Sequence, residues 1–187
     1  MANISIGDPP VPQLLIMDTG NNLMWTQCLP CTHPCLPQTL PVFDPSKSST
    51  YATKSCISFS CPGDGCDSLL RCKFSQHYLY GTRTTVAGVI ATEKFTFETS
   101  DEGTTFVSDI VFGCANDVRA SLVGQHSGIV GLGNANDKAS LPAQLGSKFS
   151  YCRGSIRDPL YPHNQLILGD GAKIEGPSTQ AEFFNGL

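Results

Sequence analysis

The stretch that decides the fold reads Leu14-Leu15-Ile16-Met17-Asp18-Thr19-Gly20, and Trp25, the chain's only tryptophan, follows seven residues after Asp18. The apolar run predicts a buried strand that starts after the turn residues at 7–10. A Thr-Gly pair favours a turn, so Asp18 is expected on a tight turn at the end of this strand. A carboxylate held there is placed to accept a proton from water. The sequence holds one Asp-Thr-Gly and no second Asp-Thr-Gly or Asp-Ser-Gly.

Length and composition indicate one domain of ordinary size without charge-driven partners. A chain of 187 residues is long enough to bury a sizeable core. Charged residues make up 15%, where about a quarter is typical, and the net charge is −4. We therefore expect no nucleic-acid partner and no anionic membrane surface as a partner. No apolar run approaches the roughly 18 residues of a membrane-spanning helix.

Nine cysteines are too many for a typical cytosolic domain unless they bind metal. Cys28, Cys31, His33 and Cys35 have the local spacing of a zinc finger, but no second pair of ligands follows, so no metal and no cofactor is expected. Disulfides and an oxidising compartment are favoured instead. Residues 1–5 have neither the basic region nor the apolar core of a signal peptide. Two explanations stay open: the chain begins late in a longer protein, or its cysteines stay reduced.

The pattern along the chain predicts a mostly β fold with one or two short helices. Alternating or apolar runs predict strands at 4–6, 11–17, 86–97, 106–112 and 165–169. Ser140, an early proline and Gly146 predict a short helix at 140–145. The segment 28–72 is rich in Pro, Ser and Cys and shows neither period, so it is expected to be irregular and held by disulfides.

Six segments carry a resemblance in their order along the chain. They are Met-Asp-Thr-Gly-Asn-Asn-Leu-Met-Trp-Thr-Gln-Cys at 17–28, Pro-Val-Phe-Asp-Pro-Ser-Lys-Ser-Ser-Thr-Tyr at 41–51, Tyr-Gly-Thr at 80–82 with Gly88, Phe-Gly-Cys at 112–114, Gly-Ile-Val-Gly-Leu-Gly at 128–133 and Lys-Phe-Ser-Tyr-Cys at 148–152. The chain thereby resembles the N-terminal lobe of pepsin-like aspartic peptidases, most closely their plant nepenthesin-like branch. The resemblance implies orthogonally packed β-sheets with one or two short helices. It also implies a single lobe at 1–187, with a Cys-rich insertion at 28–72, a flap hairpin region at 76–97 and the C-terminal lobe absent.

The resemblance also implies roles for individual residues. Asp18 is one catalytic aspartate, held by Thr19 and Gly20 beneath it. Asn21 stands where the family usually has a serine whose hydroxyl bonds the outer oxygen of the aspartate, and an amide can donate to a carboxylate from a longer side chain. Tyr80, with Gly81 and Thr82, is expected on the flap over the substrate, hydrogen-bonded to Trp25. Residues 129–131 are expected to pack behind the loop of Asp18.

The disulfides are likewise taken from the resemblance. It implies Cys28 with Cys31, Cys35 with Cys114, Cys56 with Cys72 and Cys61 with Cys66. Cys152 stays unpaired, because the matching cysteine of two-lobed relatives bonds to the second lobe. The family and the cysteine content imply a secreted, apoplastic or vacuolar protein.

The function implied is aspartic-type endopeptidase activity on peptide or protein substrates held extended beneath the flap. Two aspartates share one proton in such a site, so a lobe with one of them is expected to be inactive alone. Asp170, the other acidic candidate, lacks the Asp-Thr-Gly order. A complementary C-terminal lobe or a second copy of the chain could supply the missing aspartate. The alternative is a non-catalytic truncated homologue that binds a peptide or a partner, as the missing motif and Asn21 suggest.

Overall fold

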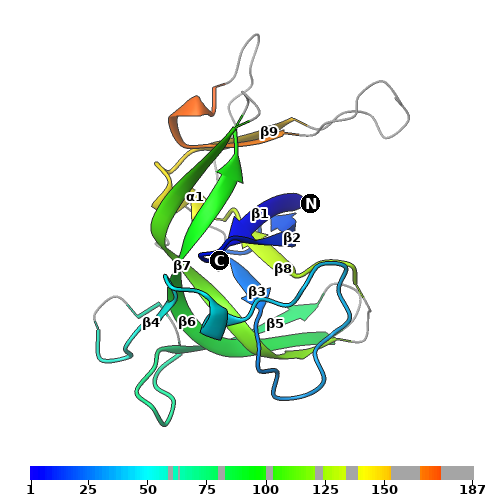
Figure 1. The fold of residues 1–187 in the computed structure, drawn as a ribbon, viewed down its shortest axis with the longest axis vertical. Coiled ribbons are helices and arrows are strands. Elements are labelled where there is room, and N and C mark those ends of the chain that lie inside the picture. The colour runs from blue at the N-terminus through cyan, green and yellow to red at the C-terminus, as the bar shows by residue number, and fades with distance from the viewer. Residues whose placement is uncertain are drawn as a thin grey trace, which may run out of the picture.

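The structure is a computed structural model that describes residues 1–58, 61–62, 64–79, 83–99, 103–120, 124–133, 139–152 and 165–173. Its elements are mostly strands (Figure 1), as the sequence predicts. They are β1 (Ala2–Ile6), β2 (Val11–Asp18), β3 (Trp25–Gln27), a 3-10 turn (Pro45–Lys47), β4 (Ala52–Thr53), β5 (Lys73–Leu79), β6 (Arg83–Glu98), β7 (Thr104–Arg119), β8 (Gly128–Gly131), α1 (Leu141–Gln144), β9 (Phe149–Cys152), β10 (Gln165–Leu168) and a second 3-10 turn (Gly169–Gly171). No helix of the described residues is long and apolar enough to cross a membrane.

Eight strands form one barrel-like sheet, in the order β1-β2-β8-β3-β7-β6-β4, with β5 paired to β6. The pairing of β1 with β6 at Ser5↔Thr96 and Ile6↔Phe95 closes the sheet on itself. Strands β6 and β7 have 16 residues each and bend across the length of the molecule (Figure 1). Strands β9 and β10 form a separate two-stranded sheet at one end. The structure thus has one barrel-like sheet and few helices, and the predicted mostly β class of a pepsin-like N-terminal lobe is confirmed.

Buried apolar side chains gather in two clusters, one on each side of this sheet's long strands. The larger cluster is organised by Phe112, whose ring lies 5.6 Å from that of Phe95 and 6.3 Å from that of Phe43, both edge-on. Edge-on aromatic pairs add to the stabilisation from burial alone. The smaller cluster contains Trp25 and Phe74. It lies directly behind the loop that follows Asp18 and therefore positions the candidate site.

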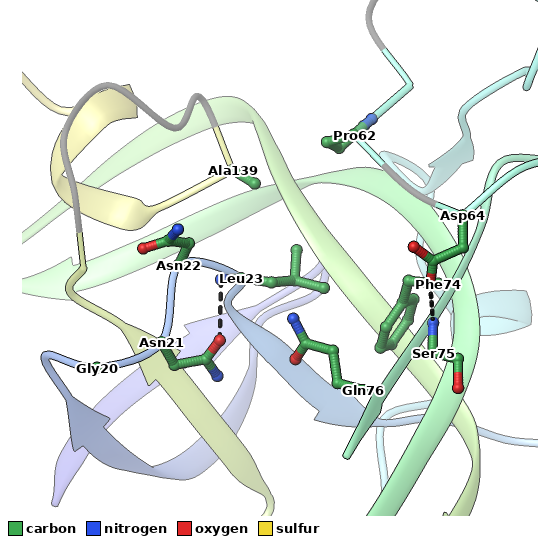
Figure 2. Close-up of a pocket in the computed structure, with 10 residues that line it drawn as sticks. All are labelled: Gly20, Asn21, Asn22, Leu23, Pro62, Asp64, Phe74, Ser75, Gln76 and Ala139. Atoms are coloured by element: carbon green, nitrogen blue, oxygen red, sulfur yellow. Dashed lines mark hydrogen bonds between the residues drawn. The ribbon is translucent and has the colours of Figure 1, made fainter. Parts of the chain in front are cut away.

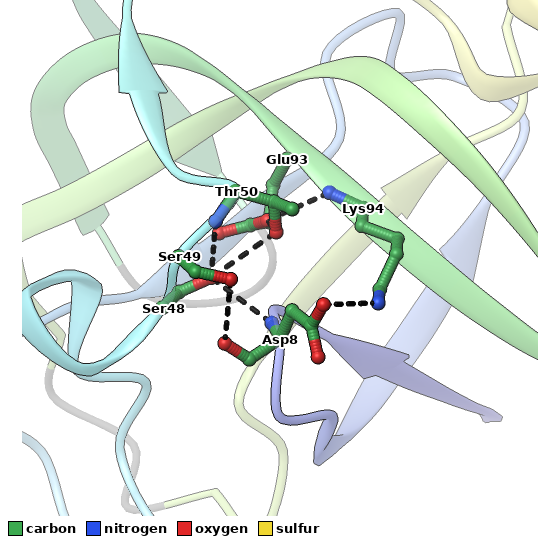
Figure 3. A network of polar contacts seen from close by, with 6 residues as sticks. All are labelled: Asp8, Ser48, Ser49, Thr50, Glu93 and Lys94. Atoms are coloured by element: carbon green, nitrogen blue, oxygen red, sulfur yellow. Dashed lines mark hydrogen bonds and ion pairs between the residues drawn. The ribbon is translucent and has the colours of Figure 1, made fainter.

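A polar network ties the turn between β1 and β2 to the segment before β4 and to β6 (Figure 3). Glu93 is fully buried, and its Oε1 accepts hydrogen bonds from the Thr50 hydroxyl and from the Lys94 N–H. The Lys94 ammonium lies 2.6 Å from Asp8 Oδ2, and the Asp8 N–H donates to Ser48 Oγ. These bonds fix the approach of the chain to β2, the strand that carries Asp18.

The structure corrects all four expected disulfides. It pairs Cys28 with Cys114, Cys31 with Cys35, Cys56 with Cys66 and Cys61 with Cys72. The reason is the parallel register of β3 on β7, in which Thr26 lies opposite Cys114. This register brings the Cα atoms of residues 28 and 114 to 5.5 Å, so the pair at 31 and 35 is left to close on itself. Cys152 is exposed and forms no disulfide in the described part of the chain.

Candidate active site

Asp18 is the last residue of β2, and a parallel partner strand fixes its position. Strand β8 lies beside β2 with Asp18 opposite Gly131, and the Leu132 N–H donates to the Asp18 carbonyl at 2.8 Å. The Gly20 N–H donates to Asp18 Oδ1 at 2.9 Å, which is the expected tight turn. The carboxylate is half-buried. Backbone and side chain are therefore both held by neighbours, and the carboxylate has little freedom to turn away.

The glycines of β8 let it pack against the loop that follows Asp18. A Cβ on Gly131 would lie 2.8 Å from the Asn21 carbonyl oxygen, and a Cβ on Gly128 would lie 2.0 Å from the Trp25 carbonyl oxygen. The Gly133 N–H donates to the Asn21 carbonyl at 2.9 Å. Residues 129–131 thus form the rigid support behind the loop.

Tyr78 is the tyrosine that binds Trp25. Its hydroxyl accepts hydrogen bonds from Trp25 Nε1 at 3.0 Å and from Asn21 Nδ2 at 2.9 Å, and donates to Gln76 Oε1. Tyr80, which was expected in this role, lies outside the described residues together with Gly81 and Thr82. The indole has a single N–H, and in the described part of the chain its partner is Tyr78. The expected place of Tyr80 on the flap stays a prediction.

Asn21 holds both the loop and the tyrosine. It is 6% exposed, and its Oδ1 accepts from the Leu23 N–H at 3.2 Å while its amide donates to Tyr78. The structure shows that the amide connects the loop of Asp18 to β5 through Tyr78. The expected donation from Asn21 to the Asp18 carboxylate stays a prediction. Thr19, next to the carboxylate, is exposed.

The Tyr78 phenol is kept neutral by its surroundings. Burial raises the pKa of Tyr78 to about 12, and the negative charge of Asp18 adds to the increase, against the opposing hydrogen bonds from Trp25 and Asn21. A neutral hydroxyl that accepts two hydrogen bonds and donates one is a fixed part of the site at any pH below this value.

Replacement of Tyr78 by phenylalanine tests this network. The native pKa of about 12 lies above the ordinary value of 10.0, so the stabilisation from this group is complete below pH 10 and is lost as the pH rises through 12. An ultraviolet titration of folded Tyr78→Phe should lack one phenolate that appears near pH 12 in the unmodified chain. Loss of a phenolate that appears near pH 10 instead would contradict the assignment.

A pocket opens between this loop and β5 (Figure 2). Its volume is about 310 Å³. The loop forms one wall, and β5 together with the end of the Cys-rich segment forms the other. The lining residues are Gly20, Asn21, Asn22, Leu23, Pro62, Asp64, Phe74, Ser75, Gln76 and Ala139. Sequence reasoning missed Asp64, Gln76 and Tyr78. Alternation along 74, 76 and 78 could have placed the last two on one face of a strand, but nothing local brings Asp64 to the loop of Asp18.

The fold and the site define a lobe of the pepsin-like class. The chain matches the family described as Xylanase inhibitor N-terminal over residues 1–170 and belongs to it, and this domain is the N-terminal lobe of pepsin-like aspartic proteases.

Among curated proteins, the chain is 40% identical to Aspartyl protease UND of Arabidopsis thaliana over 183 residues, which is 96% of this chain and 46% of that protein. It is 42% identical to Aspartic proteinase nepenthesin-2 of Nepenthes gracilis over 176 residues, 92% of this chain and 37% of that protein. It is 37% identical to Aspartic proteinase nepenthesin-1 of the same plant, over 96% of this chain and 40% of that protein. The chain thus spans less than half the length of these relatives, and the predicted resemblance to the nepenthesin-like branch is confirmed.

Proposed function

We propose that this chain provides one lobe of an aspartic-type endopeptidase and that Asp18 is one of its two catalytic aspartates. The observation that carries the proposal is the position of Asp18, which is held by the Gly20 N–H at the end of β2. The loop behind it packs on β8, so the carboxylate is presented in a fixed direction. Membership of a family that contains aspartic proteases supports the same reaction.

The proposed reaction needs a second carboxylate opposite Asp18. Two carboxylates at close range share one proton, because both cannot carry a charge there. The ionised one takes a proton from the water between them, and the protonated one polarises the carbonyl of the peptide bond. In this scheme the Gly20 N–H, which donates to Asp18 Oδ1, helps to hold the carboxylate toward the water.

Substrates and partners follow from this scheme. A peptide would lie extended across Asp18, and its side chains would reach the pocket beside Gly20. The second aspartate would come from a complementary C-terminal lobe or from a second copy of the chain. Four disulfides support a secreted, apoplastic or vacuolar location as part of the proposal.

Complementation tests the proposal. The oxidised chain is assayed at acidic pH against a denatured protein, alone and mixed with the part of Aspartyl protease UND that it does not match. We expect no cleavage by the chain alone and, in the mixture, cleavage that a pepstatin-type inhibitor blocks. Cleavage by the chain alone that rises with the square of its concentration would assign the second aspartate to another copy. A mixture that forms a stable complex, binds the inhibitor and cleaves nothing would overturn the catalytic proposal in favour of a peptide-binding role.

A further inference from the structure

We propose that the pocket beside Asp18 selects a basic side chain of a bound peptide and that Asp64 is the residue that recognises it. The inference deepens the proposed function and rests on it in one respect: the peptide must lie across Asp18. It adds a specificity residue from the Cys-rich segment, a part of the chain that takes no part in the acid chemistry.

The pocket adjoins the reacting position directly. Gly20 lines the pocket, and its N–H holds Asp18 Oδ1 at 2.9 Å. An extended chain advances about 3.3 to 3.5 Å per residue. A side chain that enters the pocket therefore belongs to a residue at the cleaved bond or close to it along the peptide.

The walls suit a long side chain with an apolar stem. Leu23 and Phe74 are both buried and face the pocket, with Ala139 at its edge (Figure 2). Lysine and arginine pack their methylene groups on apolar surface and keep the charged group near water. The apolar side chains would hold such a stem, while Asp64 lies at the rim of the pocket beside Phe74 (Figure 2).

Asp64 supplies the only charge among the ten lining residues. Its Oδ2 accepts the Ser75 N–H at 2.8 Å, and Figure 2 shows the other oxygen directed toward the pocket. No described cation forms an ion pair with it, whereas neighbouring Asp67 is bound to Arg71 at 2.6 Å. Asp64 is thus a carboxylate that is held in place and has no ion-pair partner among the residues that the structure describes.

The position of Asp64 is fixed before any ligand arrives. Its N–H donates to the Lys73 carbonyl at 2.7 Å, and the Lys73 N–H donates to the Gly65 carbonyl at 3.0 Å. The Cys61–Cys72 and Cys56–Cys66 disulfides close the segment on either side. Binding a cation here would cost little ordering of the protein, which is the condition under which a single ion pair adds to affinity.

Matched peptides test the inference. A pepstatin-type peptide is synthesised with arginine, or with citrulline as its neutral analogue of equal shape, at each position in turn. Binding of each peptide to the complemented chain is measured by fluorescence polarisation. At one position the arginine peptide should bind about three- to fivefold more tightly, as expected for an exposed ion pair. The preference should weaken at high salt. In Asp64→Asn it should disappear, while the citrulline peptide keeps its affinity.

The control variant is Asp109→Asn, which removes the same charge from an exposed position on β7. Residue 109 has a φ of 61°, a conformation that asparagine also adopts readily. Asparagine at 64 retains an oxygen for the Ser75 N–H, and unchanged citrulline binding shows that this variant is folded.

The outcomes separate this inference from the proposed function. Equal binding of arginine and citrulline peptides at every position, or a preference that survives in Asp64→Asn, overturns the basic subsite. Neither result contradicts the proposed function. A preference that depends on Asp64, in a mixture that cleaves nothing, supports the subsite and contradicts only the catalytic step. A complemented chain that binds none of the peptides overturns both.

Discussion

Replacement of Asp18 by asparagine is expected to lower acid proteolysis by the complemented chain by about 10²- to 10⁴-fold, the contribution that a positioned acid or base makes to catalysis. Asparagine has the same shape and keeps an oxygen for the Gly20 N–H. It cannot take a proton from water. The loss should therefore appear in kcat, whereas the free energy of unfolding should change by about 0.5 kcal/mol or less.

Asp170→Asn is the matched control for this experiment. Asp170 is the second acidic candidate in the sequence, but its side chain is 98% exposed, in the 3-10 turn after β10, with Lys148 at 3.7 Å. Its replacement should leave both kcat and KM unchanged. Full activity in Asp18→Asn, or a comparable loss in Asp170→Asn, would assign the chemistry to another group.

The position of Asp18 was predictable because its determinants are local. The apolar run before it forms β2, which ends at Asp18 as expected, and the Thr-Gly pair gives the turn. The short helix was predictable for the same reason. Ser140 caps α1 through a hydrogen bond from the Ala143 N–H, and its proline lies in the first turn. Signals of this kind act within about four residues and do not depend on the rest of the fold.

The features that sequence reasoning missed all depend on contacts between distant segments. Positions 78 and 80 are two apart, so a strand pattern in the sequence would put both tyrosines on one face and could not decide which hydroxyl meets Trp25. The disulfide pairs taken from the resemblance were wrong, because the pairing depends on the register of β3 on β7, which places Cys28 beside Cys114. Sequence patterns predict which face of a strand each side chain lies on. Only the register between strands determines which side chains contact each other.

Replacement of Gly128 by alanine is expected to destabilise the fold by about 3 kcal/mol or more, a large part of the usual stability of a domain. Gly128 pairs with Leu15 on β2 and with Thr26 on β3, so backbone surrounds it on both sides. A Cβ would lie 2.0 Å from the Trp25 carbonyl oxygen and 2.8 Å from the Thr26 Cα. These are backbone atoms, and no rotamer change can move them away.

The substitution should also disturb the candidate active site, because relief of the clash requires β3 and β8 to separate. Trp25 would then move from Tyr78, and the support behind Asp18 would loosen. Urea unfolding followed by Trp25 fluorescence measures the stability, and binding of a pepstatin-type peptide measures the integrity of the site.

The control variant is Gly171→Ala. A Cβ added at residue 171 would lie 3.2 Å from its nearest neighbour, the Ile167 Cγ2, which is the end of a side chain that can shift. This control should stay within about 0.5 kcal/mol of the unmodified chain. Equal stability of the two variants would mean that β8 does not lie between β2 and β3 as described, and the placement of Asp18 would lose its support.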